Sequence, residues 1–239
     1  MDLGWLLWTS FLILVPFILM EISSSFKFHF KLVSYCVLCL LISALAAPMC
    51  LLRNGGRTVD NMRCSMWYSR GLMEILPDRC VQIAKKELMY AGSVGLLTYL
   101  GGVIYINRKR TSDAKSIMAA VAQAMISDNL KVWVYPEGTR NNTGDLLPFK
   151  KGAFHLALQS QVPIIPVVYS SFTSFYNQKK NLFTGGTIKV EILPKIDTSD
   201  FTEKDITDLT EKCHQTMRQV FFRLSNKPYK DNGQSNCAQ

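Results

Sequence analysis

The sequence predicts an α/β domain with a mixed, mainly parallel sheet flanked by helices, preceded by an N-terminal transmembrane helical hairpin. Two long charge-free runs near the start predict the hairpin, because a helix that crosses a bilayer needs about 20 apolar residues. Further along, short apolar strands alternate with amphipathic helices, which is typical of α/β domains. The chain divides into two transmembrane helices (1–52), a connector (53–80), the α/β domain (81–225) and a mobile tail (226–239).

The two apolar runs are Leu3 to Met20, with 18 residues, and Leu32 to Leu52, with 21 residues. A signal peptide fits the first run poorly, because Asp2 stands where a basic segment is expected. A single signal anchor and an interfacial helical hairpin remain as alternatives to two membrane spans.

Basic residues indicate the orientation of the hairpin. The loop between the runs carries Lys27 and Lys31. The stretch after the second run carries Arg53, Arg57, Arg63 and Arg70, and then Lys85 and Lys86. The positive-inside rule therefore predicts a lumenal loop and a cytosolic domain. The net charge of +9 lies entirely after residue 52 and favours anionic headgroups or phosphorylated ligands. Nucleic acid is not expected as a partner, because no basic and aromatic recognition pattern is present.

Strand and helix patterns follow in order through the domain. Strands are expected at Val81 to Ala84, Val103 to Ile106, Lys131 to Tyr135, Ile164 to Tyr169 and Thr187 to Leu193. Helices are expected at Ser112 to Ser127, Gly152 to Gln159 and Thr202 to Leu224, with Thr202 as N-cap. A third charge-free run from Leu88 to Ile106 could span a membrane by length, but Gly101 and Gly102 favour a turn that splits it into a helix and a strand.

Seven cysteines are spaced irregularly, which favours reduced thiols over a disulfide framework. Cys36 and Cys39 form a C-x-x-C inside an apolar run and have no second pair. Packing is therefore expected there rather than metal binding, and the sequence predicts neither a metal nor a cofactor.

Two polar segments follow predicted strands, where open α/β sheets gather their ligands. Arg108 begins a run of three cations, which could bind phosphate or be a solvated charge run. The second segment contains Glu137, Gly138, Thr139 and Arg140. Gly138 lets the backbone approach a ligand, Thr139 and Arg140 offer donors, and Glu137 can orient a hydroxyl or Arg140. An ordinary turn is the alternative.

Two further segments complete the candidate site. Lys150 and Lys151 precede a predicted helix, whose N-terminus favours anions, although a basic helix cap has the same pattern. Pro166 lies in the apolar segment 162–169, which could line an acyl-chain slot or belong to the core. A proline fits a strand only at an edge or a bulge.

Together these segments resemble the 1-acylglycerol-3-phosphate O-acyltransferase family. The resemblance lies in G-G-V-I-Y-I-N-R-K-R, V-Y-P-E-G-T-R and V-P-I-I-P-V-V-Y-S-S, which are similar to the second, third and fourth family motifs. Flanking segments such as G-D-L-L-P-F-K-K-G-A-F-H-L-A are most similar to the beta-type lysophosphatidic acid acyltransferase. The resemblance implies transfer of a fatty acyl group from acyl-CoA, a co-substrate, to the sn-2 hydroxyl of lysophosphatidic acid, giving phosphatidic acid. It also implies a multi-pass protein of the endoplasmic reticulum membrane, in contact with membrane lipids.

The family's first motif, H-x-x-x-x-D, does not occur in this sequence. The three histidines, His29, His155 and His214, are followed at that spacing by Ser34, Ser160 and Gln219. By resemblance, the motif's histidine takes the proton of the acceptor hydroxyl and its aspartate orients the histidine. The motif should stand shortly before G-L-M-E-I-L-P, so we expect a deletion of several tens of residues near 69–71 and an incomplete sheet.

No catalytic residue is therefore identified. His155 is expected to be packed in its helix, and His214 to be partly exposed and structural. We expect impaired acyl transfer. The alternatives are a catalytically inactive, membrane-bound lipid- or CoA-binding or regulatory variant, an acyltransferase for another lysophospholipid, and a truncated transcript.

Overall fold

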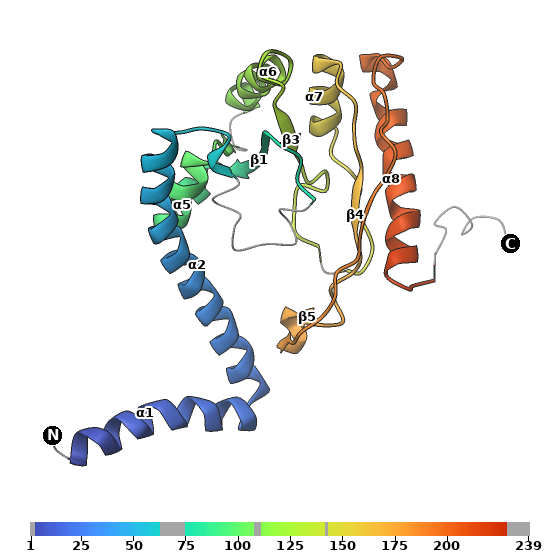
Figure 1. The fold of residues 1–239 in the computed structure, drawn as a ribbon. Helices are drawn as coiled ribbons and strands as arrows, with labels where there is room; N and C mark the ends of the chain where they lie inside the picture. Colours follow the sequence, from blue (N-terminus) through green and yellow to red (C-terminus); the bar gives the residue numbers. More distant parts are fainter. Residues whose placement is uncertain (1–2, 63–74, 108–110, 142, 229–239) are drawn as a thin grey trace, which may run out of the picture.

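The computed structural model describes residues 3–62, 75–107, 111–141 and 143–228. Two long helices at the N-terminus precede an α/β domain, in which a layer of helices covers short strands (Figure 1). The predicted deletion near 69–71 lies outside the described residues.

The first two helices are α1 (Leu3–Ile22) and α2 (Ser24–Asn54). The chain turns between them at Ser23, whose hydroxyl accepts a hydrogen bond from the Phe26 N–H at 3.2 Å and so caps α2. In the part of the chain that the structure describes, α2 alone is long and apolar enough to cross a membrane, judged by length and composition. The second predicted run lies inside α2.

The third charge-free run does not form a membrane span. It contains most of the 3₁₀ helix η1 (Lys86–Tyr90), the helix α5 (Gly92–Leu100) and the strand β2 (Ile104–Ile106). Nine helical residues extend only about 14 Å, which is half the thickness of a bilayer core. The predicted turn between helix and strand is confirmed, and Gly102 adopts a φ of +78° there.

Helix α5 packs against the C-terminal half of α2. Ala47 and Cys50 of α2 form a buried cluster with Leu97 and Leu100 of α5. Beside this cluster, the hydroxyls of Ser43 and Ser93 lie 2.7 Å apart. The long helix is thus attached to the domain through apolar packing and a buried polar contact.

A three-stranded parallel sheet forms the first half of the domain, in the order β2-β1-β3. The central strand β1 (Cys80–Lys85) pairs with β2 on one side and β3 (Lys131–Trp133) on the other. The helix α6 (Thr111–Ser127) connects β2 to β3, as expected for a parallel crossover. The predicted parallel arrangement is confirmed here, although the third strand ends at Trp133 rather than Tyr135.

The strands of the second half are antiparallel. The strand β4 (Val167–Tyr169) pairs with β7 (Val190–Ile192). Between them in sequence lies a small hairpin of β5 (Tyr176–Asn177), η2 (Gln178–Lys180) and β6 (Leu182–Phe183). No crossover helix separates β4 from β7, so the chain returns antiparallel and the overall sheet is mixed, as predicted.

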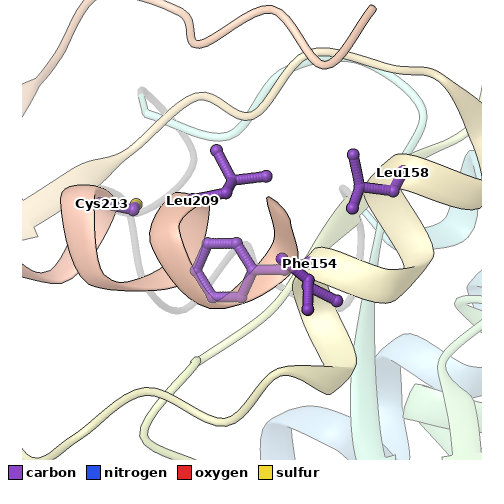
Figure 2. Packing of buried hydrophobic residues seen from close by; sticks show 5 residues of the cluster. Phe154, Leu158, Leu209 and Cys213 are labelled. Atoms are coloured by element: carbon purple, nitrogen blue, oxygen red, sulfur yellow. The ribbon is translucent and has the colours of Figure 1, made fainter. Parts of the chain in front are cut away.

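Three helices lie side by side along these strands: α6, α7 (Gly152–Ser160) and α8 (Ile206–Leu224) (Figure 1). Thr202 starts the last helix through the short η3 (Glu203–Asp205), as predicted, and forms a capping box with Asp205. Phe154 and Leu158 of α7 pack against Leu209 and Cys213 of α8 (Figure 2).

The opposite side of α7 packs against the parallel sheet. Leu156 is buried with Val121 and Ala122 of α6, and Val132 of β3 lies against the same cluster. Helix α7 therefore contacts the core under α6 and the core under α8. It connects two groups of strands that share no backbone pairing in the described residues.

Both ends of the domain are fixed by polar contacts. Asn61, in the connector, is fully buried and donates to the Gly56 carbonyl at 2.7 Å and the Leu100 carbonyl at 3.2 Å. Near the C-terminus, the Lys227 ammonium donates to the Gly144 carbonyl and the Ser171 hydroxyl. The chain therefore still contacts the domain at Lys227, and the extent of the mobile tail stays a prediction.

Gly95→Ala should destabilise the protein by about 1–3 kcal/mol, because the added methyl would collide with the Met89 carbonyl at the joint of η1 and α5. Thermal unfolding of the detergent-solubilised protein measures the change. Gly152→Ala is the control, because a methyl there meets nothing within 4 Å. Equal transition temperatures for the two variants would contradict the packing described for α5.

Candidate functional site

The candidate site is a loop between β3 and α7 whose two ends are joined by backbone hydrogen bonds. The Lys150 N–H donates to the Pro136 carbonyl at 2.8 Å, and the Gly138 N–H donates to the Tyr135 carbonyl at 3.0 Å. Gly138 has a φ of +65°, and a methyl at its α carbon would lie 2.9 Å from Cδ of Lys150. The structure thus brings together Gly138 and Lys150, which the sequence assigned to one site.

The Glu137 carboxylate supports the loop from inside. Its Oε2 accepts hydrogen bonds from the Leu147 N–H at 2.9 Å and from Nδ2 of Asn141 at 3.2 Å. Asn141 also donates to the Asp145 carbonyl. Glu137 therefore holds the shape of the loop in this structure, while its role in orienting a hydroxyl or Arg140 stays a prediction.

Thr139 and Arg140 lie at the exposed tip of the loop. Among the described residues, their backbone N–H groups have no hydrogen-bond acceptor, and neither Arg140 nor Lys150 has an ion-pair partner. Two uncompensated cations and free N–H groups around a glycine form a surface that is suited to an anion such as phosphate.

The other predicted site residues lie elsewhere. The ammonium of Lys151 donates to the Thr207 hydroxyl at 2.8 Å and links α7 to α8. Pro166 is buried at the start of β4, and its carbonyl accepts from the Leu193 N–H at 2.9 Å. Both therefore contribute to the scaffold in this structure. Arg108 lies outside the described residues.

The two histidines of the domain differ in environment. His155 is exposed on α7, so the expectation that it is packed is wrong: it faces away from the side of α7 that contacts α6 and α8. His214 is partly buried, as predicted, with its ring edge-on to Phe149 at 4.8 Å. Its Nε2 is buried without a partner in the described residues. The Asp145 carboxylate, which interacts electrostatically with His214, is already bound by Arg218 in an ion pair.

This ion pair joins the loop to α8 and was not found by sequence reasoning. The guanidinium of Arg218 contacts the carboxylate of Asp145 through two hydrogen bonds of 2.8 and 2.7 Å. The hydrogen bond from Arg218 is the main cause that lowers the pKa of Asp145. The residues are 73 positions apart, and the only hint in the sequence is an arginine on the apolar side of a helix.

Two buried thiols, Cys80 and Cys213, are poor nucleophiles at neutral pH. Burial raises the pKa of Cys80 and of Cys213 to about 11 each. The five described cysteines are free, as expected. The site therefore offers anion-binding groups but no activated cysteine.

Asp145→Asn should lower the free energy of unfolding by about 1–3 kcal/mol, because it leaves a buried guanidinium without its charged partner. This range allows for solvent screening of a carboxylate that is 36% exposed. The lowered pKa makes the stabilisation complete well above pH 3.8, and it is lost as the pH falls through the folded-state value.

Urea unfolding at several pH values measures this difference, which should shrink below about pH 4. Asp197→Asn removes an exposed partner of Lys195 and should change stability by less than about 0.5 kcal/mol. An equal loss in both variants would show that the Asp145 pair does not hold the loop.

Known proteins with similar sequences were then compared with the chain. The sequence profile of the family described as Acyltransferase matches residues 65–170. The chain is 47% identical over 258 residues to human 1-acyl-sn-glycerol-3-phosphate acyltransferase beta, covering 92% of each protein. It is 38% identical over 154 residues to the 1-acyl-sn-glycerol-3-phosphate acyltransferase of Haemophilus influenzae, covering 64% of this chain and 63% of the relative. The crystal structure of the LPA acyltransferase PlsC from Thermotoga maritima aligns with a TM-score of 0.49 at 21% identity, covering 64% of this chain and 62% of that one.

The alignment with the human relative is longer than this chain. Because 92% of 239 residues is about 220, about 40 of the 258 aligned positions have no residue here. In the bacterial alignment almost every position has a residue of this chain, because 64% of the chain is about 153 residues and the alignment has 154 positions. The long match to the human relative contains gap positions that the shorter bacterial match lacks, and it covers 92% of this chain. On this identity and coverage, the chain belongs to the 1-acyl-sn-glycerol-3-phosphate acyltransferase family.

Proposed function

We propose that this chain binds acyl-CoA and lysophosphatidic acid, and transfers the acyl group to the sn-2 hydroxyl at a much reduced rate. The observation that carries the proposal is the joined loop, in which Gly138, Arg140 and Lys150 form an exposed, uncompensated cationic surface. The names of the relatives support a lysophospholipid acceptor. Arg140 and Lys150 would neutralise a phosphate monoester, and the free N–H groups of Thr139 and Arg140 would bind its oxygens.

In the reaction, the acceptor hydroxyl attacks the thioester carbonyl, and the CoA thiolate leaves. An alcohol is a weak nucleophile until a base takes its proton. The sequence contains no H-x-x-x-x-D, and Asp145 is engaged by Arg218. General acid–base assistance contributes roughly 10²–10⁴ in rate, so we expect turnover to be lower by at least this factor.

Lys150→Met and Lys151→Met form a matched pair that tests the site. Lys150 crosses the loop, whereas Lys151 bonds to Thr207 on α8. Loss of one phosphate contact should weaken binding of lysophosphatidic acid or acyl-CoA about tenfold in the first variant and less than about threefold in the second. Binding to the protein in lipid nanodiscs is measured together with phosphatidic acid formation.

Turnover close to that of the human relative would contradict the role given to the missing base. Binding without any turnover would favour the non-enzymatic lipid- or CoA-binding variant. Equal effects of the two lysine substitutions, or no binding of either substrate, would reject the site itself.

Membrane attachment through α1 and α2 is the second part of the proposal. The exposed side of α2 carries large apolar residues, such as Val37, Leu41 and Leu45. The side chains of these three residues are 48–78% exposed. On the same helix, Ala47 and Cys50 are buried against the domain. An exposed apolar surface of this length on a helix is suited to lipid.

Contacts at both ends of α2 favour an anchor in one leaflet over the predicted two-span hairpin. Near its start, Phe28 is 2% exposed and packs against the rings of Tyr176 and Phe183, and Lys31 donates to the Phe183 carbonyl at 2.8 Å. Near its end, Cys50 packs on α5. These contacts are about 33 Å apart along the helix, which exceeds the bilayer core. Because the same folded domain contacts both ends of α2, a bilayer cannot lie between the two ends of this helix.

Ser25→Cys and Ser127→Cys report on the two sides of the membrane. Both serines are exposed, one in the first turn of α2 and one at the end of α6 in the domain. In sealed vesicles, an impermeant maleimide should label both variants equally above the background of the parent chain. Labelling of only one variant before detergent is added would support the two-span hairpin. Location in the endoplasmic reticulum stays a prediction from the family resemblance.

A further inference from the structure

In the described residues, the parallel sheet ends at β3 with an unpaired edge. The Lys131 N–H donates to the Arg79 carbonyl at 2.9 Å, so Lys131 and Trp133 direct their backbone groups toward β1. Val132 therefore directs its N–H and carbonyl away from β1. In the described parts of the chain, no strand accepts them.

The antiparallel pair has a matching edge at β4. The Ser170 N–H donates to the Lys189 carbonyl, and the Leu193 N–H donates to the Pro166 carbonyl, so these groups of β4 face β7. Val167 and Tyr169 direct their backbone groups to the opposite side. Within the described residues, that side also has no paired strand.

These two edges lie on either side of an interruption in the sheet. The rings of Trp133 and Tyr169 approach to 6.5 Å between centroids, although their strands share no backbone hydrogen bond. The hydroxyl of Tyr169 is buried without a partner in the described residues, and burial raises its pKa to about 12. Buried hydroxyls are rarely left unpaired, so this atom marks a place where a partner group is missing.

Helix α7 bridges the interruption. Leu156 packs beside Val132 of β3, while Phe154 and Leu158 pack beside Ile164 and Ile196, next to β4 and β7. Packed helices are spaced by about 8–10 Å and paired strands by about 4.8 Å, so one helix covers the width of two strand spacings. Helix α7 thus packs beside β3 on one side and beside Ile164 and Ile196 on the other, which is a width that suits one additional strand between the two open edges.

We propose that the gap between β3 and β4 binds one extended strand in trans, supplied by a full-length relative from the segment that has no counterpart in this chain. About 40 aligned positions of the human relative have no residue in this chain, which is more than one strand needs. The two open edges can accept an extended chain through main-chain hydrogen bonds. The chain would then act as a partner of an intact family member. The inference concerns strand pairing and does not depend on acyl transfer.

A synthetic peptide with the sequence of those unmatched positions of the human relative tests the proposal. The peptide is titrated into the full-length chain in nanodiscs, with a scrambled peptide as control. Binding should slow amide hydrogen exchange in the segments 131–135 and 166–170, while 190–192 changes little. Only the unscrambled peptide should bind.

Val167→Pro removes a donor from the open edge of β4 and should weaken peptide binding about tenfold. Ile192→Pro is the matched control, because Ile192 lies on the outer edge of β7. The affinity of this variant for the peptide should be within about twofold of that of the parent chain. Tyr169→Phe removes the unpaired hydroxyl, so the variant should fold as well as the parent and bind the peptide several-fold more weakly.

Absence of binding to the parent chain would reject the proposal. Equal weakening by Val167→Pro and Ile192→Pro, or protection of 190–192 alone, would also reject it, because the strand would then add to the outer edge. Dimers of this chain that form without the peptide and disappear with Val167→Pro would show that a second copy fills the gap instead.

Discussion

The packing of α7 is the constraint on which the rest of the domain depends. In an ordinary α/β domain, backbone hydrogen bonds between neighbouring strands continue across the whole sheet. Here the described strands form separate groups. Helix α7 links them, because Leu156 packs beside β3, whereas Phe154 and Leu158 pack on α8, which in turn covers β4. Burial of such side chains contributes about 1.5–3 kcal/mol each, so a nine-residue helix can replace several strand hydrogen bonds.

The geometry of the loop between β3 and α7 also depends on the packing of α7. It leaves β3 at Pro136 and returns to α7 at Lys150, so the position of α7 decides whether its two ends meet. The ion pair of Asp145 with Arg218 then fixes the middle of the loop to α8. The proposed anion site and the helix packing are thus coupled, and the cationic tip is formed although the sequence lacks the histidine–aspartate motif.

The elements were largely predictable from the sequence, because their periodicity and their punctuation by glycine and proline are local properties. The split of residues 88–106 and the Thr202 cap are examples. Contacts over long distances in sequence were not predictable. The hydrogen bond from Lys151 to Thr207 and the packing of Phe28 on the β5–β6 hairpin depend on tertiary structure. The inward position of Glu137 also needed the loop to be closed first.

Native-state hydrogen exchange in low urea tests most directly whether the helix layer unites the two groups of strands. The account predicts that amides of β1 (Cys80–Lys85) and of β7 (Val190–Ile192) exchange through one common opening, with the same free energy and the same urea dependence. It further predicts that Leu158→Ala lowers the opening free energy of β1 and that of β7 by the same amount. Separate openings, with β1 protected after β7 has exchanged, would contradict the claim that α7 makes one cooperative domain of an interrupted sheet.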